Sequence, residues 1–446
     1  MSKKPSLPSD IPAANPAPHR GGNGASRARP APSPAVNPLH SARIGLLLTG
    51  GGARTAYQAG VLSAVAEIVG GTHFPYRFLS GSSAGSINAA FLASHATRWP
   101  QAAQDLCDVW HSITAERVFS TEVLNWYLRG ARWISWLAVP RIVKHQPDAF
   151  LDNSPLIKTL RELIDMDAIG ENLSAGHFDA IGIGASSYTS GRHVTFYQAR
   201  EQVSDWQSAD RVALRQPLSI QHLAASSAIP FVFSPVPLQI NGGVEWFGDG
   251  TMRQSAPLMP LVQAGAQRIL AISVSPEERA SMFARRQDSG DKPPTLAQVA
   301  GHALASVFYD ALPAEIEQIE RVNAALQLLK REIPDQFPFR PMEVLAIFPS
   351  EPIENIALRH VRTLPPRVRS FLKTFGGTES SGMSLASYLL FEPQFTDELI
   401  DLGRRDAMAK AAQIRALFDP QAIEIDEPGL DLVRQSLRGF FERFAR

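Results

Sequence analysis

Residues 76–88 read YRFLSGSSAGSIN, and this stretch decides the fold expected of the chain. The aromatic and apolar residues of a short strand stop at Gly81-Ser82-Ser83-Ala84-Gly85, and small residues that suit a helix follow. A G-x-S-x-G match between a strand and a helix predicts a nucleophile elbow, with Ser83 at the tip of a strained turn. A side chain at Gly81 or Gly85 would collide with the neighbouring strand or helix. The alternative is a small-residue turn that fits by chance, which the flanking strand and helix disfavour.

Strand and helix patterns alternate on both sides of this turn. The apolar run 44–49 (IGLLLT) is typical of a strand buried on both faces, and it leads through three glycines into a helical pattern. The alternation predicts an α/β fold with a mainly parallel sheet covered by helices on both faces, and a site at the carboxyl ends of the strands. Further strands are expected at 178–188, 193–198, 244–250, 268–275 and 342–350, a loop at 224–236, a hairpin turn at 241–243, and helices at 256–265, 296–312, 314–330, 384–390 and 397–418.

The composition indicates a globular protein preceded by a tail. The chain has 446 residues, of which 44% are hydrophobic and 19% charged, and its 43 basic residues equal its 43 acidic ones, so nothing favours nucleic acid as a partner. Cys107 is the only cysteine, which excludes an internal disulfide and fits a reducing, cytoplasmic location. Residues 1–42 are rich in Pro and Ala and are expected to be disordered. They lack the apolar core of a signal peptide, and no later apolar run is long enough to span a membrane.

One segment suggests contact with a membrane surface. Residues 123–144 interleave tryptophans with four basic residues, Arg129, Arg132, Arg141 and Lys144. Aromatic and basic residues together are typical of a segment that lies in a lipid interface, so this range is a candidate peripheral membrane contact. A core helix pair whose arginines extend to solvent explains the pattern equally well.

The glycine-rich loop is the second candidate for chemistry. Gly50, Gly51 and Gly52 lie between a strand and a helix, where backbone N–H groups unshielded by side chains could stabilise an oxyanion, with Arg54 adding positive charge. A nucleotide site is a weaker reading, because Thr55 breaks the G-x-G-x-x-G pattern and the chain contains no P-loop motif. A plain tight turn is the third reading.

The residue types leave the base for Ser83 open. A Ser-His-Asp triad is the usual arrangement on such folds, but His302 and His360 are the only histidines after Asp249, and neither follows a strand. Asp249 ends a predicted strand, is followed by Gly250, and could take the serine proton directly if it is partly desolvated. An ordinary Asp-Gly turn is the better reading on spacing alone.

Four motifs together resemble the patatin-like phospholipases. They are GGGART (50–55), GSSAG (81–85), the loop SSAIPFVFSPV (226–236), and Asp249-Gly250 with the segment 251–275 that follows. The resemblance covers roughly residues 43–275 and implies a three-layer fold related to the α/β-hydrolases. It also implies a Ser-Asp dyad, with Ser83 as nucleophile, Asp249 as base, and Gly51, Gly52 and Arg54 lining the oxyanion hole. The chain departs from the family pattern at Thr55 and at Thr251, which stands where the family has glycine or alanine.

The resemblance implies a serine acyl hydrolase that cleaves fatty-acyl esters of phospholipids or lysophospholipids. There are two alternatives. One is an acyltransferase that uses the same acyl-enzyme, and the other is a catalytically silent scaffold that binds lipid or protein. No cofactor or metal is expected, because no calcium loop or histidine pair with metal spacing occurs. We expect a tail at 1–42, a catalytic domain at 43–275, and a mostly helical extension at 276–446 with one added strand, packed on the same domain.

Overall fold

The computed structural model describes residues 43–120, 149, 151–201, 203, 211–240, 242–276, 311–328, 340–364, 369 and 383–419. All of these residues belong to one compact unit. The tail at 1–42, the aromatic and basic segment at 123–144, and almost all of the helix expected at 296–312 lie outside the described residues.

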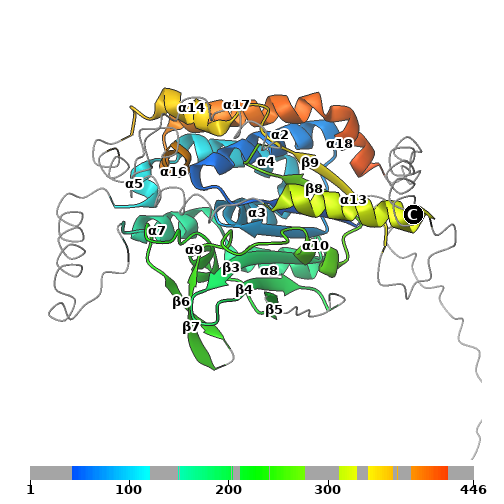
Figure 1. The fold of residues 1–446 in the computed structure, drawn as a ribbon, viewed down its shortest axis with the longest axis horizontal. Coiled ribbons are helices and arrows are strands. Elements are labelled where there is room, and N and C mark those ends of the chain that lie inside the picture. Colours follow the sequence, from blue (N-terminus) through cyan, green and yellow to red (C-terminus); the bar gives the residue numbers. More distant parts are fainter. Residues whose placement is uncertain are drawn as a thin grey trace, which may run out of the picture. The chain divides into compact units, whose positions relative to one another are not determined.

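The described strands form one nine-stranded sheet (Figure 1). Five strands at its centre and at one edge are parallel, in the order β3, β2, β1, β8 and β9. At the other edge, β4 and β5 run in the opposite direction, and the β6–β7 hairpin joins the sheet where β7 pairs antiparallel with the end of β3. The strand bounds are β1 Ile44–Leu48, β2 Phe78–Ser82, β3 Ala180–Ser187, β4 His193–Ala199, β5 Arg211–Arg215, β6 Val236–Ile240, β7 Gly243–Gly248, β8 Arg268–Ile272 and β9 Glu343–Ile347.

Helices cover both faces of the sheet because its central strands are apolar on both sides. In β1, Leu46 and Leu48 belong to the larger core cluster, whereas Leu47 faces a second cluster that contains Leu261 and Leu312. On the first face lie α2 Ala56–Val69, α3 Ala84–Ser94, α4 Trp99–Ser112, α14 Ile353–His360, α16 Met383–Leu389, α17 Pro393–Ala409 and α18 Ala411–Phe418. On the second lie α10 Met259–Ala264 and α13 Leu312–Leu328. The expected three-layer α/β architecture is confirmed.

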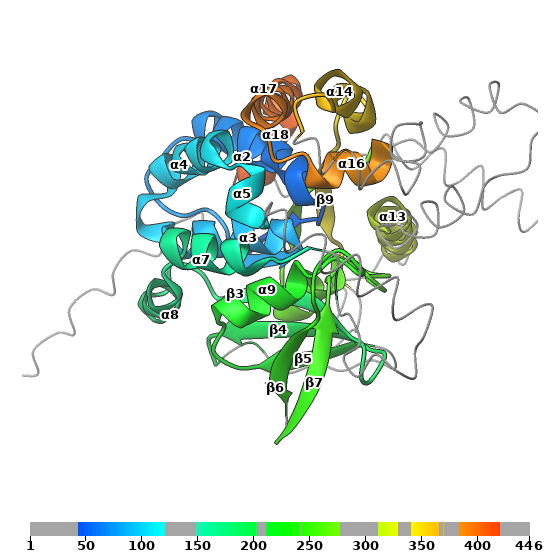
Figure 2. The ribbon, with the colours of Figure 1, turned by 90° about the vertical axis from the view of Figure 1, so that its left-hand side faces the viewer.

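Six further helices complete the described elements. They are η1 Gly52–Thr55, η2 Ala96–Arg98, α5 Ala115–Val118, α7 Ser154–Leu163, α8 Met166–Ala175 and α9 Ile220–Ser226. In Figure 2, α2, α4, α14 and α17 lie together at the top of the view, and the β6–β7 hairpin extends at the bottom. No described helix has the length and apolar character that crossing a lipid bilayer requires.

The structure corrects three of the expected elements and adds one strand. Residues 224–226, expected in a loop, form the last turn of α9, whose seven residues are too few to show a helical period. β5 was not expected, because RVALR places arginine at both ends and only Ala213 is buried. The helix expected at 397–418 is divided at Lys410 into α17 and α18, and the one expected at 256–265 begins only at Met259, beside a proline at its start.

Candidate active site

Ser83 occupies a strained turn between β2 and α3. Its φ of 53° and ψ of −136° are unusual for a residue with a side chain, and such strain is typical of a nucleophile elbow. A Cβ atom at Gly81 would lie 2.6 Å from the carbonyl oxygen of Gly85, and a Cβ atom at Gly85 would meet the carbonyl oxygen of Leu48. The two glycines therefore allow α3 to start close to strands β1 and β2, which holds Ser83 at the tip.

Asp249 reaches Ser83 from an antiparallel strand. β7 approaches from beyond the end of β3 and pairs with only its last two residues, so the carboxyl end of β7 arrives at the same edge of the sheet as the carboxyl end of β2. The Ser83 Oγ donates a hydrogen bond of 2.6 Å to Asp249 Oδ2, and both residues are buried. The site therefore lies at the carboxyl ends of the strands as expected, but one of its groups comes from the hairpin rather than from the parallel part of the sheet.

The surroundings of Asp249 favour a carboxylate that can accept a proton. Burial raises the pKa of the Asp249 carboxyl, while hydrogen bonds from Ser83 and Thr251 lower it. Thr251 donates twice to Oδ1, from its backbone N–H at 2.9 Å and from its hydroxyl at 2.5 Å. Burial, together with the negative charge of Asp249, raises the pKa of Tyr188 to about 12. A raised carboxylate pKa brings the group closer to the range that suits a general base.

The glycine-rich loop approaches Ser83 with backbone amides that are uncommitted. Among the described residues, the N–H groups of Gly50, Gly51 and Gly52 donate no hydrogen bond. A Cβ atom at Gly50 would lie 2.7 Å from Ser83 Cβ, so the loop can approach the nucleophile only because this residue is glycine. These amides could therefore stabilise an oxyanion that forms at Ser83.

Buried side chains hold both ends of this loop. The Gln58 side-chain amide donates to the Thr49 carbonyl at 2.8 Å, just before the glycines. The Asn88 side-chain amide donates to the Thr55 carbonyl at 3.2 Å, just after them, and to Gln58 Oε1 at 3.0 Å. Amides fixed in this way need little reorganisation when charge develops.

The Arg54 side chain has partners that the sequence did not predict. Its guanidinium pairs with Glu354 at 2.9 Å, donates to Ser387 Oγ at 2.7 Å, and lies over the Tyr388 ring at 4.4 Å. These contacts direct the positive charge towards α14 and α16, so the side chain anchors the loop to the C-terminal helices. A place for Arg54 in the oxyanion hole stays a prediction.

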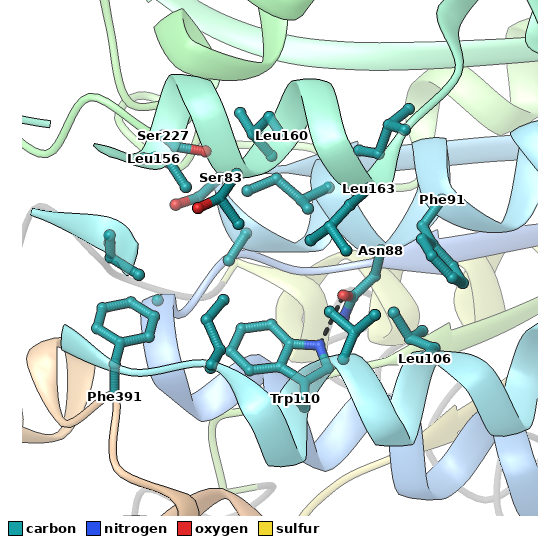
Figure 3. A pocket seen from close by; sticks show the side chains of 18 of the residues that line it. Ser83, Asn88, Phe91, Leu106, Trp110, Leu156, Leu160, Leu163, Ser227 and Phe391 are labelled. Atoms are coloured by element: carbon teal, nitrogen blue, oxygen red, sulfur yellow. Dashed lines mark hydrogen bonds between the residues drawn. The ribbon is translucent and has the colours of Figure 1, made fainter. Parts of the chain in front are cut away.

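A pocket lined almost entirely by apolar side chains opens beside Ser83. α3 contributes Ala84, Ile87 and Phe91, which share one face at helical spacing, and α4 and α7 form the opposite walls. Figure 3 shows Ser83 and Leu156 together at one end of the cavity and Phe91 at the other. Its apolar lining beside the serine hydroxyl suits contact with the hydrocarbon part of a ligand.

Ser226 links the nucleophile to the acid, a role that sequence reasoning missed. Its hydroxyl accepts a hydrogen bond from the Ser83 N–H at 2.9 Å and donates to the Gly184 carbonyl at 2.6 Å, while its own carbonyl accepts from the Gly250 N–H at 2.9 Å. The signal was the loop motif at 226–236, which resembled the family but had no role assigned to it. The next residue, Ser227, lines the cavity, and within the described residues its buried hydroxyl has no hydrogen-bond partner.

Metal ligands are not grouped in the part of the chain that the structure describes. No set of three or more His, Cys, Asp or Glu residues there could hold a metal ion. The groups that gather at Ser83 are a carboxylate, hydroxyls and backbone amides, which suit acyl transfer through a serine nucleophile.

A family comparison agrees with this geometry. The model of the patatin-like phospholipase family matches residues 46–262. The chain contains a patatin-like phospholipase domain. The match includes the glycine-rich loop, Ser83 and Asp249, and the members of this family are lipid acyl hydrolases. No curated protein matches the sequence.

Solved structures similar to this chain share little sequence with it. VipD from Legionella pneumophila is 13% identical, with a TM-score of 0.27 over 81% of this chain and 67% of its own. Human GIVD cytosolic phospholipase A2, bound to methyl gamma-linolenyl fluorophosphonate, is 14% identical, with a TM-score of 0.39 over 88% of this chain and 61% of its own. The ExoU–SpcU complex of Pseudomonas aeruginosa gives 16% identity and a TM-score of 0.23, over 88% and 82% of the two chains. The chain thus spans less than two thirds of the human phospholipase.

Proposed function

We propose that this protein is a serine acyl hydrolase that cleaves fatty-acyl esters of phospholipids or lysophospholipids through a Ser83–Asp249 dyad. The observation that carries the proposal is the 2.6 Å hydrogen bond from Ser83 Oγ to Asp249 Oδ2 at the end of an apolar cavity. The dyad supplies a nucleophile with its base, and the cavity supplies room for the acyl chain of the substrate.

The first half of the reaction forms an acyl-enzyme. Ser83 Oγ attacks the ester carbonyl carbon while its proton passes to Asp249 Oδ2. The carbonyl oxygen becomes an oxyanion, which accepts hydrogen bonds from the uncommitted amides of Gly50, Gly51 and Gly52. The tetrahedral intermediate collapses, the bond to the alcohol oxygen breaks, and the alcohol leaves with the proton from Asp249.

The second half releases the fatty acid. Asp249, again ionised, takes a proton from a water molecule that attacks the acyl carbonyl of Ser83. The same amides stabilise the second oxyanion, and collapse of this intermediate returns the proton to Ser83 Oγ. If an alcohol replaced this water, the product would be a new ester, so the acyltransferase alternative differs only in the acceptor.

The decisive experiment combines hydrolysis with covalent labelling. We expect release of p-nitrophenol from acyl esters to fall by at least about a thousandfold in Ser83→Ala and in Asp249→Asn, because each variant removes one half of the nucleophile–base pair. A fluorophosphonate probe should label the unaltered protein and fail to label Ser83→Ala. The matched control is Ser82→Ala, one residue away, which removes a buried hydroxyl that has no hydrogen-bond partner among the described residues.

Several outcomes would contradict the proposal. Full hydrolysis by Ser83→Ala or Asp249→Asn would exclude the dyad. An inert but folded unaltered protein that binds lipid would support the silent scaffold. Ester formation that outpaces fatty-acid release when a lipid alcohol is supplied would support the acyltransferase. Peripheral membrane contact through 123–144 stays a prediction from sequence, since this range lies outside the described residues.

A further inference from the structure

We propose that Thr251 is a positioning residue that fixes the Asp249 carboxylate for proton transfer. This inference rests on the proposed function, because it assigns a role around the same dyad. The two carboxylate oxygens have separate tasks: Oδ2 accepts from Ser83, whereas Oδ1 accepts only from Thr251 among the described residues.

Two donors on one oxygen prevent rotation of the carboxylate. The Thr251 N–H and hydroxyl both reach Oδ1, at 2.9 and 2.5 Å. Turning the carboxylate plane away from Ser83 would lengthen both hydrogen bonds, and each is stronger than a neutral one because the acceptor is charged. The backbone N–H alone would permit more rotation, since a single donor fixes a distance but not a plane. The hydroxyl is therefore the group that completes the clamp.

The rest of the Thr251 side chain is held in place by the glycine-rich loop. A Cβ atom at Gly50 would collide with Thr251 Cγ2, so the threonine methyl group packs against this glycine. With the methyl group on Gly50 and the hydroxyl on Asp249, the threonine rotamer is determined at both branches. Thr251 thereby joins the base to the loop whose amides face the developing oxyanion.

Other ionisable groups near Asp249 do not replace this clamp. The Tyr188 hydroxyl donates to the sulfur of Met252 at 3.7 Å, and His193 Nε2 lies 3.1 Å from the carbonyl oxygen of Gly250. Tyr188 lies in the turn after β3, and His193 begins β4, so both come from the neighbouring edge of the sheet. The arrangement is comparable in purpose to the acid of a Ser-His-Asp triad, which orients the base without taking part in the bond changes.

The test compares substitutions that separate the hydroxyl from the shape of Thr251. In Thr251→Val, which keeps the shape and removes the hydroxyl, we expect kcat for a p-nitrophenyl ester to fall about 10- to 100-fold with KM nearly unchanged. The acid limb of the kcat profile should move upward by about one pH unit, because the carboxylate loses a charged hydrogen bond. Thr251→Ser restores the hydroxyl and should recover most of the rate and the original profile.

The outcomes distinguish this inference from the proposed function. If Ser83→Ala is inactive but Thr251→Val keeps both the rate and the pH profile, the positioning role is wrong and the dyad stands. A loss of rate in Thr251→Val with an unmoved profile and no recovery in Thr251→Ser would mean that Thr251 only supports the local structure. If Ser83→Ala keeps its activity, the proposed function itself fails. Thr251→Ala, measured with the same readouts and a melting curve, decides the case if the valine variant does not fold.

Discussion

At Asp249 a fully buried carboxylate accepts hydrogen bonds from Ser83 and Thr251, with no charged partner causing its pKa shift. Burial raises its pKa, so between the ordinary aspartate pKa and the raised one the folded state binds a proton that the unfolded state lacks. The residue therefore favours folding most at low pH, and this contribution is lost as the pH rises through the folded-state pKa. The negative charge that lets Asp249 act as a base therefore lowers the free energy of unfolding at the pH at which the enzyme would work.

We predict that Asp249→Asn raises the free energy of unfolding by about 0.5–2 kcal/mol at alkaline pH. The asparagine oxygen can keep both hydrogen bonds from Thr251, its NH₂ group can donate to Ser83 Oγ, and the buried charge is gone. The gain should shrink as the pH falls through the raised pKa of Asp249. Urea titrations at alkaline and acidic pH measure this gain. The control is Ser83→Ala, which should lower the free energy of unfolding because the buried Asp249 carboxylate loses a hydrogen-bond donor. Equal or lower stability of Asp249→Asn at alkaline pH would contradict this account.

The two residues of the dyad differed in how far sequence could identify them. Ser83 was predicted from local signals, because the strand, the glycines and the helix all lie within a few residues of it. Asp249 is 166 residues away, and its place at the end of a strand made it only a candidate base, so the family resemblance was needed to favour it over a plain Asp-Gly turn. The hydrogen bonds of Ser226 could not be predicted, because they join it to residues in separate segments of the chain. Those from Thr251 to Asp249 are local, but on spacing alone the Asp-Gly pair was read as an ordinary turn.

Among the elements, the buried parallel strands β1 and β8 were predictable because nearly all of their residues are apolar. The antiparallel approach of β7 was not, since a sequence pattern carries no strand direction. The pocket likewise depends on tertiary packing, because its wall from α7 is distant in the chain from those of α3 and α4. Its length follows from α3, whose residues from Ala84 to Phe91 span about 10 Å.

We predict that Leu163→Trp shortens the acyl chain that the protein accepts. Leu163 lines the cavity from α7, and Figure 3 shows it away from Ser83, so a larger ring should fill the space for the end of a long chain. Hydrolysis of a p-nitrophenyl palmitate should fall at least about tenfold relative to the butyrate, which corresponds to about 1.4 kcal/mol. The control is Lys158→Trp, which places the same ring on the exposed side of α7. An unchanged ratio of the two rates would exclude the cavity as the acyl site.

In the molecule as a whole, the C-terminal helices support the segment that carries the glycine-rich loop. α17 packs against α2, where Tyr57 donates to Asp406 at 2.9 Å and Asp406 also accepts from the Ser350 N–H at 2.9 Å. Sequence predicted helices in this region but not their partners, since α2 and α17 are more than 300 residues apart. The division into a catalytic domain at 43–275 and an extension at 276–446 stays a prediction, and these contacts make independent folding of the first part improbable on physical grounds.

We predict that Gly403→Val destabilises the protein by about 3 kcal/mol and reduces ester hydrolysis with it. A Cβ atom at Gly403 would collide with the carbonyl oxygen of Tyr57, so α17 must move away from α2, which directly follows the glycine-rich loop. Asp401→Val adds the same side chain at an exposed position of α17 and should leave stability within about 0.5 kcal/mol of the unaltered protein. Melting curves and p-nitrophenyl ester assays measure both effects.

If Gly403→Val melted at the original temperature yet lost activity, the helix pair would act on the loop by displacement rather than through stability. If it changed neither, the C-terminal helices would not support the site at all.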